Sequence, residues 1–492
     1  MKEADDHTIQ QIGIPSVVLM ERAALQIVDT MIREKIDLRK ALIVCGSGNN
    51  GGDGFAAARL LKERGYDVSV FFAGKEGSLS EECRLQKSIA GRLGIRIFTE
   101  FPEEEYTVII DAVFGAGLNR EITGRFREVI CWMNKKSGQK VAADIPSGIC
   151  SENGQVLGTA FRAHLTIAIE CVKLGCVLYP GREYAGRIAA VPIGIDTSVY
   201  SGRGDVCFTY ENGEMPYLLP PRSENSHKGS YGKVLMITGS PGMAGAAFLS
   251  ARAAYTAGAG LVRIYTAEEN RSVLQGLLPE AVISCWNGYD KEEMDRLLGW
   301  ADVVCIGCGL GQTSVSEKIL LHTVQRVKKP CVIDADGLNL LSVHKELLEQ
   351  TEGKIILTPH MKEMSRLTGK AVEEIAEQRM QILDQFTERY PAVCVLKDSR
   401  TVAACLGYPK FVNLAGNSAM AKAGSGDVLA GVITGLLAQG MEPFRGAALG
   451  VWLHACGGDA AREEKGAYSV LAGDLIDGIQ KCIKNAEECI EK

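Results

Sequence analysis

The sequence predicts an α/β protein made of two three-layer domains, each a mainly parallel sheet with helices on both faces. Three observations lead to this expectation. The 492 residues are too many for one ordinary domain. Buried strands alternate regularly with segments of helical periodicity, as in parallel sheets. Between residues 196 and 227 the sequence turns irregular, with a Pro-Pro pair and many Ser and Asn residues. We therefore place a boundary near residue 205 and expect domains 1–205 and 206–492.

The composition is typical of a soluble globular protein, with 46% hydrophobic and 23% charged residues. A formal charge of −6 gives no support for nucleic acid as a partner. No apolar run reaches the roughly 18 residues of a membrane span, so we expect no membrane association. The 16 cysteines are scattered, several inside apolar runs, so we expect reduced thiols and a cytoplasmic protein. Cys305 and Cys308 form C-x-x-C, but no second pair follows at zinc spacing.

The first half begins with helical periodicity over residues 3–34. A buried strand at 41–45, a glycine-rich turn at 46–54, a helix at 55–64 and a strand at 67–73 follow. This order of elements predicts a βαβ unit.

The glycine-rich turn resembles a dinucleotide-binding turn, because Gly46, Gly48 and Gly51 fit the spacing G-x-G-x-x-G. The second strand, however, lacks the acidic residue that such folds place at its end. The turn also carries two asparagines and Asp53, which a merely flexible turn does not need. The alternative interpretation is a polar turn in which Asp53 caps the next helix.

Two later strands of the first half end in Asp111 and Asp144, and Ser147 follows shortly after. Ligands of open α/β sheets bind beyond the carboxyl ends of the strands. Asn50, Asp111 and Ser147 offer only hard oxygen ligands, which suit a weakly held cation better than zinc. Asp144 is the candidate for a carboxylate that moves a proton.

These motifs, together with residues 19–24, 165–168, 173–175 and 186–193, resemble the NAD(P)H-hydrate epimerase family. Members of that family have a Rossmann-like fold, interconvert the R and S hydrates of NADH and NADPH, and bind potassium. The resemblance implies that Asn50, Asp111 and Ser147 hold potassium and that Asp144 lies at the reacting ring. It also implies that the hydrate is contacted by Asn49, Asn50, Gly51, Gly52, Asp53, Gly115, Ala116, Gly117, Leu118, Asn119, Arg120, Glu121 and Asp144. One departure is Arg22, where the family often has Asn.

The second half repeats the alternation of strands and helices. Its strands are expected at 233–238, 261–266, 303–306, 331–334, 354–358 and 393–397. Polar groups again follow the strands. A glycine turn lies at 307–311, two carboxylates at Asp334 and Asp336, and a histidine at His360 followed by Glu363. A purely structural role is the alternative for His360, but its position at a strand end favours a role in binding.

The stretch 416–440 carries the strongest functional signal of this half. Its apolar residues recur at helical spacing and predict a helix with one buried face. Gly424-Ser425-Gly426-Asp427 comes directly before this helix, where bare N–H groups and the helix dipole accept phosphate. Asp427 could then take a proton from a hydroxyl that attacks phosphorus. The alternative is that Asp427 is only a helix cap.

Residues 397–401 are suited to holding the phosphates or ribose of a nucleotide. Their alternative interpretation is a tight hairpin between two strands, and both can hold at once.

Together these features resemble the ribokinase-like superfamily, and more closely its NAD(P)H-hydrate dehydratase family. The matching motifs are 228–232, 245–247, 358–360 and 423–427, and the one departure is Lys362 in place of Gly. The two resemblances cover roughly residues 1–205 and 210–490.

The resemblance implies that bacterial-type members use ADP, or ATP, with magnesium to dehydrate the S hydrate, giving NAD(P)H, AMP and phosphate. It implies that Asp427 is the catalytic base. The hydrate would be contacted by Ala247, Gly309, Gly311, His360 and Asp427, and the nucleotide by Lys397, Asp398, Ser399, Arg400, Thr401, Gly424, Ser425 and Gly426. We also expect a homo-oligomer. Two alternatives remain, a ribokinase-type small-molecule kinase fused to a nucleotide-binding module, and a first half that only binds.

Overall fold

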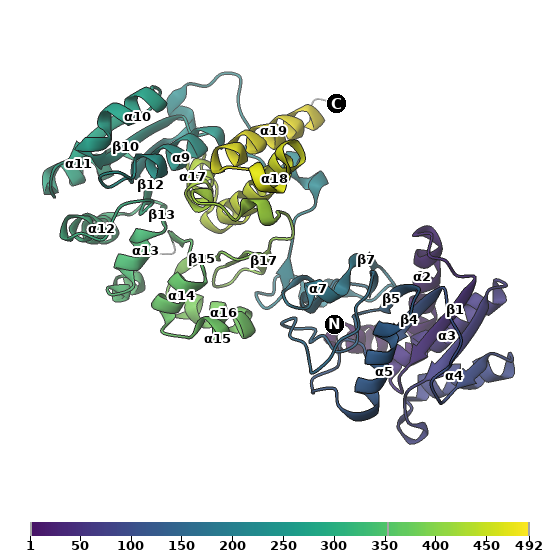
Figure 1. Cartoon of the computed structure of the whole chain (residues 1–492). Helices are drawn as coiled ribbons and strands as arrows, with labels where there is room; N and C mark the ends of the chain where they lie inside the picture. Colours follow the sequence, from purple (N-terminus) through teal and green to yellow (C-terminus); the bar gives the residue numbers. More distant parts are fainter. Residues whose placement is uncertain (1, 352–353, 491–492) are drawn as a thin grey trace. The chain divides into compact units, whose positions relative to one another are not determined.

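The computed structural model of the chain describes residues 2–351 and 354–490 (Figure 1). The chain forms two compact units, Met1–Ser201 and Gly202–Lys492. In each unit a mainly parallel sheet lies between layers of helices, so the predicted fold class is confirmed.

The sheet of the first unit has seven parallel strands in the order β3-β2-β1-β4-β5-β6-β7. The chain builds outward from β1 to β3 and then returns to place β4 on the other side of β1. The crevice beyond such a reversal is where open α/β sheets bind ligands. The strands are β1 (Lys40–Cys45), β2 (Asp67–Phe72), β3 (Arg96–Phe98), β4 (Val108–Ala112), β5 (Gln139–Ala143), β6 (Leu165–Ile169) and β7 (Arg187–Val191).

Helices cover both faces of this sheet. On one face Ile43 and Ile110 share a buried core with Phe55 of α3, and on the other Ile109 shares one with Ile130 of α5. The helices are α1 (Lys2–His7), the π-helical η1 (Thr8–Ile12), α2 (Ser16–Arg33), α3 (Asn49–Glu63), α4 (Glu81–Arg92), α5 (Gly124–Lys135), α6 (Leu174–Val177) and α7 (Arg182–Ala185), with 3-10 turns η2 (Glu76–Ser78) and η3 (Thr197–Tyr200). α3 begins at Asn49 rather than at residue 55, so the prediction of a turn through residue 54 is wrong.

The sheet of the second unit has ten strands in the order β11-β10-β9-β12-β13-β14-β15-β16-β17-β8, and its order reverses between β9 and β12. Among the described residues of this sheet, only the pairs β15–β16 and β16–β17 are antiparallel. The strands are β8 (Cys207–Phe208), β9 (Lys233–Ile237), β10 (Leu261–Ala267), β11 (Val282–Trp286), β12 (Val303–Ile306), β13 (Cys331–Ile333), β14 (Ile355–Leu357), β15 (Ala392–Leu396), β16 (Val402–Ala404) and β17 (Lys410–Val412).

Four helices of the second unit, α9, α17, α18 and α19, gather in one layer (Figure 1) and share a core with the sheet. The helices are α8 (Met215–Leu218), α9 (Ala244–Thr256), α10 (Arg271–Leu277), α11 (Lys291–Trp300), α12 (Ser314–Arg326), α13 (Asp336–Leu341), α14 (Met361–Thr368), α15 (Val372–Glu377), α16 (Arg379–Arg389), α17 (Ser425–Ala438), α18 (Pro443–Ser469) and α19 (Ala472–Ile490). Short 3-10 turns are η4 (Asn212–Glu214), η5 (Lys228–Tyr231), η6 (Glu268–Asn270), η7 (Lys345–Gln350) and η8 (Ser418–Met420).

Helix α17 is buried on all sides from Val428 to Ala438, whereas its spacing predicts one buried face. The reason is its close packing on α9. A Cβ added at Gly431 would lie 2.2 Å from the Ser250 carbonyl oxygen, and one at Gly435 would lie 2.4 Å from that of Ala254. The two glycines thus allow backbone-to-backbone contact, which fixes the start of α17 over the sheet.

Across the part of the chain that the structure describes, no helix combines the length and the apolar character that crossing a bilayer requires.

Candidate active sites

The crevice of the first unit lies beyond β1 and β4, and glycines bring α3 close to both strands. A Cβ at Gly46 would lie 2.0 Å from the Val113 carbonyl oxygen, and one at Gly54 would lie 2.7 Å from Ala112 Cβ. A Cβ at Gly51 would lie 2.1 Å from the Gly46 carbonyl oxygen. Close packing therefore explains Gly46 and Gly51 of the G-x-G-x-x-G spacing, whereas a Cβ at Gly48 would have no atom within 4 Å.

Asn50 is the buried polar residue at the start of α3. It is 9% exposed, and neither its amide nitrogen nor its amide oxygen has a hydrogen-bond partner. A Cβ added at Gly115 would lie 3.4 Å from Asn50 Cβ and 3.6 Å from Asp144 Oδ2, so Asn50 and Asp144 flank Gly115. Because an unpartnered buried amide is costly, this position fits one that completes its bonds with a ligand.

Asp111 and Ser147 form a buried pair at the ends of β4 and β5. Ser147 Oγ donates to Asp111 Oδ1 at 2.7 Å, and the Ser147 N–H donates to Asp111 Oδ2 at 2.8 Å. The Phe114 N–H donates to Ser147 Oγ at 2.9 Å, which links the pair to the loop that holds Gly115. Burial raises the pKa of Asp111 to about 6. The oxygens of these groups, with that of Asn50, fit the hard-ligand set expected for potassium.

Asp144 directly follows β5 and has a positive φ of 69°, which is unusual for a residue with a side chain. Its carboxylate forms an ion pair with Lys173, whose ammonium also donates to the Ile169 carbonyl oxygen at 2.6 Å. The Ala116 and Ile169 N–H groups donate to it as well, at 3.4 and 3.3 Å. These bonds hold Asp144 at the crevice. The sequence did not predict a role for Lys173, which lies within the matching stretch 173–175.

The remaining predicted contacts of the first unit differ in exposure. Asn49, Gly117, Asn119, Arg120 and Glu121 are exposed, and Gly51 and Gly52 are buried. Leu118 and Asp53 are intermediate.

Arg22, the departure from the epimerase pattern, donates to the Ile193 carbonyl oxygen at 3.2 Å and packs against Gly194. Its guanidinium thus contacts the loop after β7.

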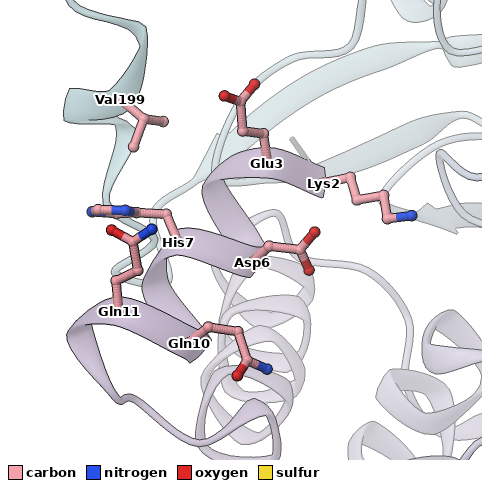
Figure 2. Close-up of a pocket in the computed structure, with 7 residues that line it drawn as sticks. All are labelled: Lys2, Glu3, Asp6, His7, Gln10, Gln11 and Val199. Atoms are coloured by element: carbon pink, nitrogen blue, oxygen red, sulfur yellow. The ribbon is translucent and has the colours of Figure 1, made fainter.

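An open pocket in this unit lies on the N-terminal helix rather than at the strand ends. Figure 2 shows the side chains of Asp6 and His7 on this helix, and His7 Nε2 lies 3.4 Å from Asp196 Oδ2. The pocket is lined by Lys2, Glu3, Asp6, His7, Gln10, Gln11 and Val199. Since none of these is a predicted site residue, the strand ends remain the candidate site.

In the second unit an ion pair links three neighbouring strand ends. Lys397, at the end of β15, places its ammonium 2.5 Å from Asp334 Oδ1 and 4.0 Å from Glu363 Oε2. Thr358, after β14, donates to Asp334 Oδ1 at 2.7 Å. Burial raises the pKa of Glu363 to about 7. The sequence placed Lys397 on the nucleotide; the structure shows its ammonium paired with Asp334.

The start of α17 meets this ion pair. Gly424 has a φ of 88°, and no side chain caps the helix. A Cβ at Gly426 would lie 3.5 Å from Lys397 Nζ and 3.6 Å from Asp334 Oδ2. Ser425 Oγ lies 3.3 Å from Nε2 of the buried His454. An uncapped helix start beside a lysine is suited to a phosphate group.

Asp427 directly follows Gly426 in helix α17. Burial raises its pKa to about 6, and the negative charge of Asp334 acts in the same direction. Ligand atoms of Cys308, Asp334 and Asp427 all lie within 4.8 Å of one another. The carboxylates fit a hard cation such as magnesium, but the buried Cys308 thiol does not, and a hydrogen bond with the Cys305 thiol, together with burial, raises the pKa of Cys308 well above its usual range.

His360 caps α14, as its structural alternative proposed. The His360 Nδ1 accepts hydrogen bonds from the backbone N–H groups of Lys362 and Glu363 at 3.1 and 3.2 Å. The backbone N–H of His360 donates to Glu363 Oε2 at 2.8 Å. The side chain remains 47% exposed, and its Nε2 lies 3.3 Å from Glu363 Oε1. Lys362 has no positive φ and its side chain is exposed, so the departure from Gly is accommodated.

The other residues predicted to contact the hydrate in the second unit lie partly in the glycine turn and partly in the core. The Gly311 N–H donates to Asp336 Oδ2 at 2.9 Å, and Gly309 has a φ of 59° in the glycine turn. Ala247 is completely buried in the core.

Residues 397–401 form the tight hairpin between β15 and β16. Arg379 donates to the Asp398 carboxylate at 2.6 Å, and Thr401 Oγ1 donates to the Asp398 carbonyl oxygen at 3.1 Å. Arg400 donates to the Leu414 carbonyl oxygen at 2.9 Å, and Ser399 is exposed.

The parallel sheet, the uncapped helix start and the neighbouring acid define the second unit as a ribokinase-like α/β fold, and the first unit is Rossmann-like. Solved structures support this class. A ribokinase-like superfamily protein from Enterococcus faecalis has a TM-score of 0.52 and 28% identity, covering 58% of this chain and 97% of its own. An ADP/ATP-dependent NAD(P)H-hydrate dehydratase from Bacillus subtilis has a TM-score of 0.50 and 30% identity, covering 57% and 98%.

Sequence comparison identifies the family more closely than the solved structures do. Residues 234–481 match the NAD(P)H-hydrate dehydratase family, and residues 16–175 match the family described as YjeF-related protein N-terminus. The bifunctional NAD(P)H-hydrate repair enzyme Nnr of Moorella thermoacetica is 34% identical over 100% of this chain and 97% of its own. That of Escherichia coli is 34% identical over 91% and 85%. The chain belongs to the family of bifunctional NAD(P)H-hydrate repair enzymes, and both resemblances found in the sequence are confirmed.

Proposed function

We propose that the chain repairs hydrated NADH and NADPH. The first unit epimerises the R and S hydrates, and the second dehydrates the S form with ADP, giving NAD(P)H, AMP and phosphate. The observation that carries this proposal is the presence of two separate strand-end sites, around Asp144 and Asp427, in a chain that matches repair enzymes over its full length. A single kinase would need only the second site.

Dehydration requires a good leaving group, because hydroxide leaves poorly from the hydrated ring. Asp427 takes the proton of the ring hydroxyl as its oxygen attacks the terminal phosphorus of ADP, and the bond to AMP breaks. The start of α17 stabilises the charge of the transferring phosphoryl group through its N–H groups. Phosphate then leaves the ring, assisted by the ring nitrogen, and the adjacent carbon loses a proton, which restores the dihydronicotinamide.

The charged residues at the strand ends position these partners. Lys397 lies 3.5 Å from the position of a Gly426 Cβ, so its ammonium faces the place of the phosphate. The hairpin 398–401 offers donors to the nucleotide, and Gly309, Gly311 and the partly exposed side chain of His360 bind the hydrate. Magnesium, when bound with the nucleotide, neutralises phosphate charge, and the Asp334 and Asp427 carboxylates would hold it.

Epimerisation inverts the carbon that carries the hydroxyl. Asp144, fixed by Lys173, accepts a proton at the crevice, and Asn50 and the loop from Gly115 bind the hydrate. Asn50, Asp111 and Ser147 would hold potassium, which supplies positive charge close to the bound coenzyme. We further propose a homo-oligomer in the cytoplasm, a reducing compartment in keeping with the free cysteines of the described residues.

Purified protein, mixed R and S hydrates and ADP or ATP test this function through the recovery of dihydronicotinamide absorbance. Asp427→Asn should abolish recovery and leave epimerisation intact, because only the base of the second site is lost. Asp144→Asn should stop recovery once the S form is consumed. Stable phosphorylation of a small alcohol, with no action on the hydrates, would instead identify a ribokinase-type kinase.

A further inference from the structure

Helix α18 carries a buried histidine, His454, that the proposed mechanism does not use. His454 is 8% exposed, and its Nε2 lies 3.3 Å from Oγ of Ser425. Ser425 is the first residue of α17, the helix whose start we assign to the transferring phosphate. The contact therefore joins the interior of the second unit to the phosphate position.

The loop that leads into α17 is bound to α18 at its other end as well. Asp459 of α18 accepts hydrogen bonds from the Gly416 N–H at 2.9 Å and from the Asn417 amide at 2.7 Å. Asp459 thus holds the beginning of the loop, and His454 contacts Ser425 at its end. Because both ends are held by one helix, the position of Ser425 relative to His454 is set by the fold before any ligand binds.

The surroundings of His454 keep its ring neutral. Burial lowers the pKa of His454 to about 4; a hydrogen bond with the Ser425 main chain opposes this effect, and the charge of Lys397 reinforces it. A neutral imidazole carries one N–H and one bare nitrogen. His454 Nε2 therefore either donates a hydrogen bond to Ser425 Oγ or accepts one from it.

A bound phosphate makes these two arrangements unequal. The oxygens of an ionised phosphate accept hydrogen bonds and do not donate them. If Nε2 accepts the Ser425 proton, the hydroxyl turns its lone pairs toward the phosphate and repels it. If Nε2–H donates instead, the Ser425 O–H can point to the phosphate beside the first N–H groups of α17. Ser425 is only partly buried, so its hydroxyl can face His454 on one side and a ligand on the other.

We propose that His454 is a positioning residue of the dehydratase, whose Nε2–H donates to Ser425 Oγ and directs the Ser425 hydroxyl to the phosphoryl group that ADP transfers. This inference rests on the dehydratase function proposed above. In this arrangement His454 acts only through Ser425. A hydrogen bond to a charged group corresponds to about a 10-fold to 100-fold effect on an equilibrium or rate.

A double-mutant cycle tests this connection. Recovery of dihydronicotinamide absorbance from the S hydrate and ADP is compared for the wild type, Ser425→Ala, His454→Leu and the double variant. Each single change should lower kcat by about 10-fold to 100-fold, with a smaller change in KM, because the lost bond is to the group that transfers. Since both changes remove the same bond to phosphate, the double variant should match Ser425→Ala within about twofold. Losses that multiply in the double variant would overturn the proposal.

A third substitution separates the hydrogen bond from packing. The amide nitrogen of His454→Gln can donate in the place of Nε2, so this variant should recover most of the rate that His454→Leu loses. A His454→Gln protein as slow as His454→Leu would count against the proposed donor.

His322→Leu is the matched control. His322 is 7% exposed in the same unit, and its ring bonds to Tyr289 and Asp295. This variant should keep the wild-type kcat below its thermal midpoint. An equal loss of kcat in His322→Leu would show that removal of any buried histidine slows the unit, and the role of His454 would then be rejected.

The wild-type chain offers a test that needs no substitution to fold. In nitrogen NMR spectra of histidine-labelled protein with ADP, the His454 ring should be neutral and carry its hydrogen on Nε2. A hydrogen on Nδ1 would overturn the proposal whatever the variants do. If the wild-type chain does not dehydrate the hydrate with ADP, the proposed function fails; if it does and His454→Leu keeps its kcat, only the assignment of His454 fails.

Discussion

Gly426→Ala tests directly whether the start of α17 binds phosphate. Gly426 is the second residue of the helix and has no positive φ. An added Cβ would lie 3.5 Å from Lys397 Nζ and 3.6 Å from Asp334 Oδ2, which are ordinary contact distances. The methyl group therefore fits the fold. The greater helix propensity of Ala should favour folding by up to about 1 kcal/mol.

The same methyl group should obstruct the phosphate. It takes the space between the first N–H groups of α17 and the ammonium of Lys397, where the transferring group must lie. Loss of one donor of this kind costs about 100-fold to 1,000-fold in kcat, or about 2.7–4 kcal/mol. We therefore expect kcat/KM for ADP to fall at least about 100-fold, while epimerisation and the thermal midpoint are unchanged or slightly improved.

The assay follows recovery of dihydronicotinamide absorbance against ADP concentration. Gly473→Ala is the matched control, because Gly473 lies in the first turn of α19 and an added Cβ there would have no atom within 4 Å. The control should keep wild-type dehydration. A Gly426→Ala protein that folds normally and still uses ADP at the wild-type rate would refute the assignment of the phosphate to this helix.

Three further predictions concern single residues. The dehydratase rate should fall as the pH drops below about 6, because burial raises the Asp427 pKa to about 6 and the base must be ionised. Asp427→Asn should have no dehydratase activity at any pH. Lys397→Met should leave Asp334, whose side chain is 2% exposed, without its cation and destabilise the second unit by about 3–5 kcal/mol in urea unfolding, with the first unit unaffected. Asn50→Leu removes two unpartnered buried polar atoms, so the thermal midpoint of the first unit should rise while epimerisation is lost; a fall in both would contradict the idea that Asn50 is reserved for a ligand.

Periodicity predicted the fold well because parallel sheets bury nearly continuous apolar strands. It failed where tertiary contacts override local pattern. The helix α3 begins at Asn49 because its glycines pack against β1 and β4, and a local preference for turns cannot reveal that contact. Strand β11 (Val282–Trp286) has no counterpart among the predicted strands, since it is an edge strand in which Trp286 is the one buried residue. Burial of α17 on all sides follows from contacts with α9, which no spacing encodes.

The candidate sites were predictable where an acid stands beside glycines, at a strand end for Asp144 and Asp334 and at a helix start for Asp427. Their partners were not predictable in the same way. Lys173 pairs with Asp144 across 29 positions of sequence, and Lys397 pairs with Asp334 across 63. Only the order and register of the strands in the folded sheet bring such groups together, so a single sequence shows each lysine as one cation among many.

The two units nevertheless share an arrangement of charged side chains. In each, a largely buried lysine pairs with one aspartate, Lys173 with Asp144 and Lys397 with Asp334. In each, a second aspartate at the start of a helix, Asp53 or Asp427, has no ion pair among the described residues, and burial raises its pKa. Because burial raises the pKa of Asp427 only to about 6, Asp427 is ionised near pH 7 and can start its reaction as a base.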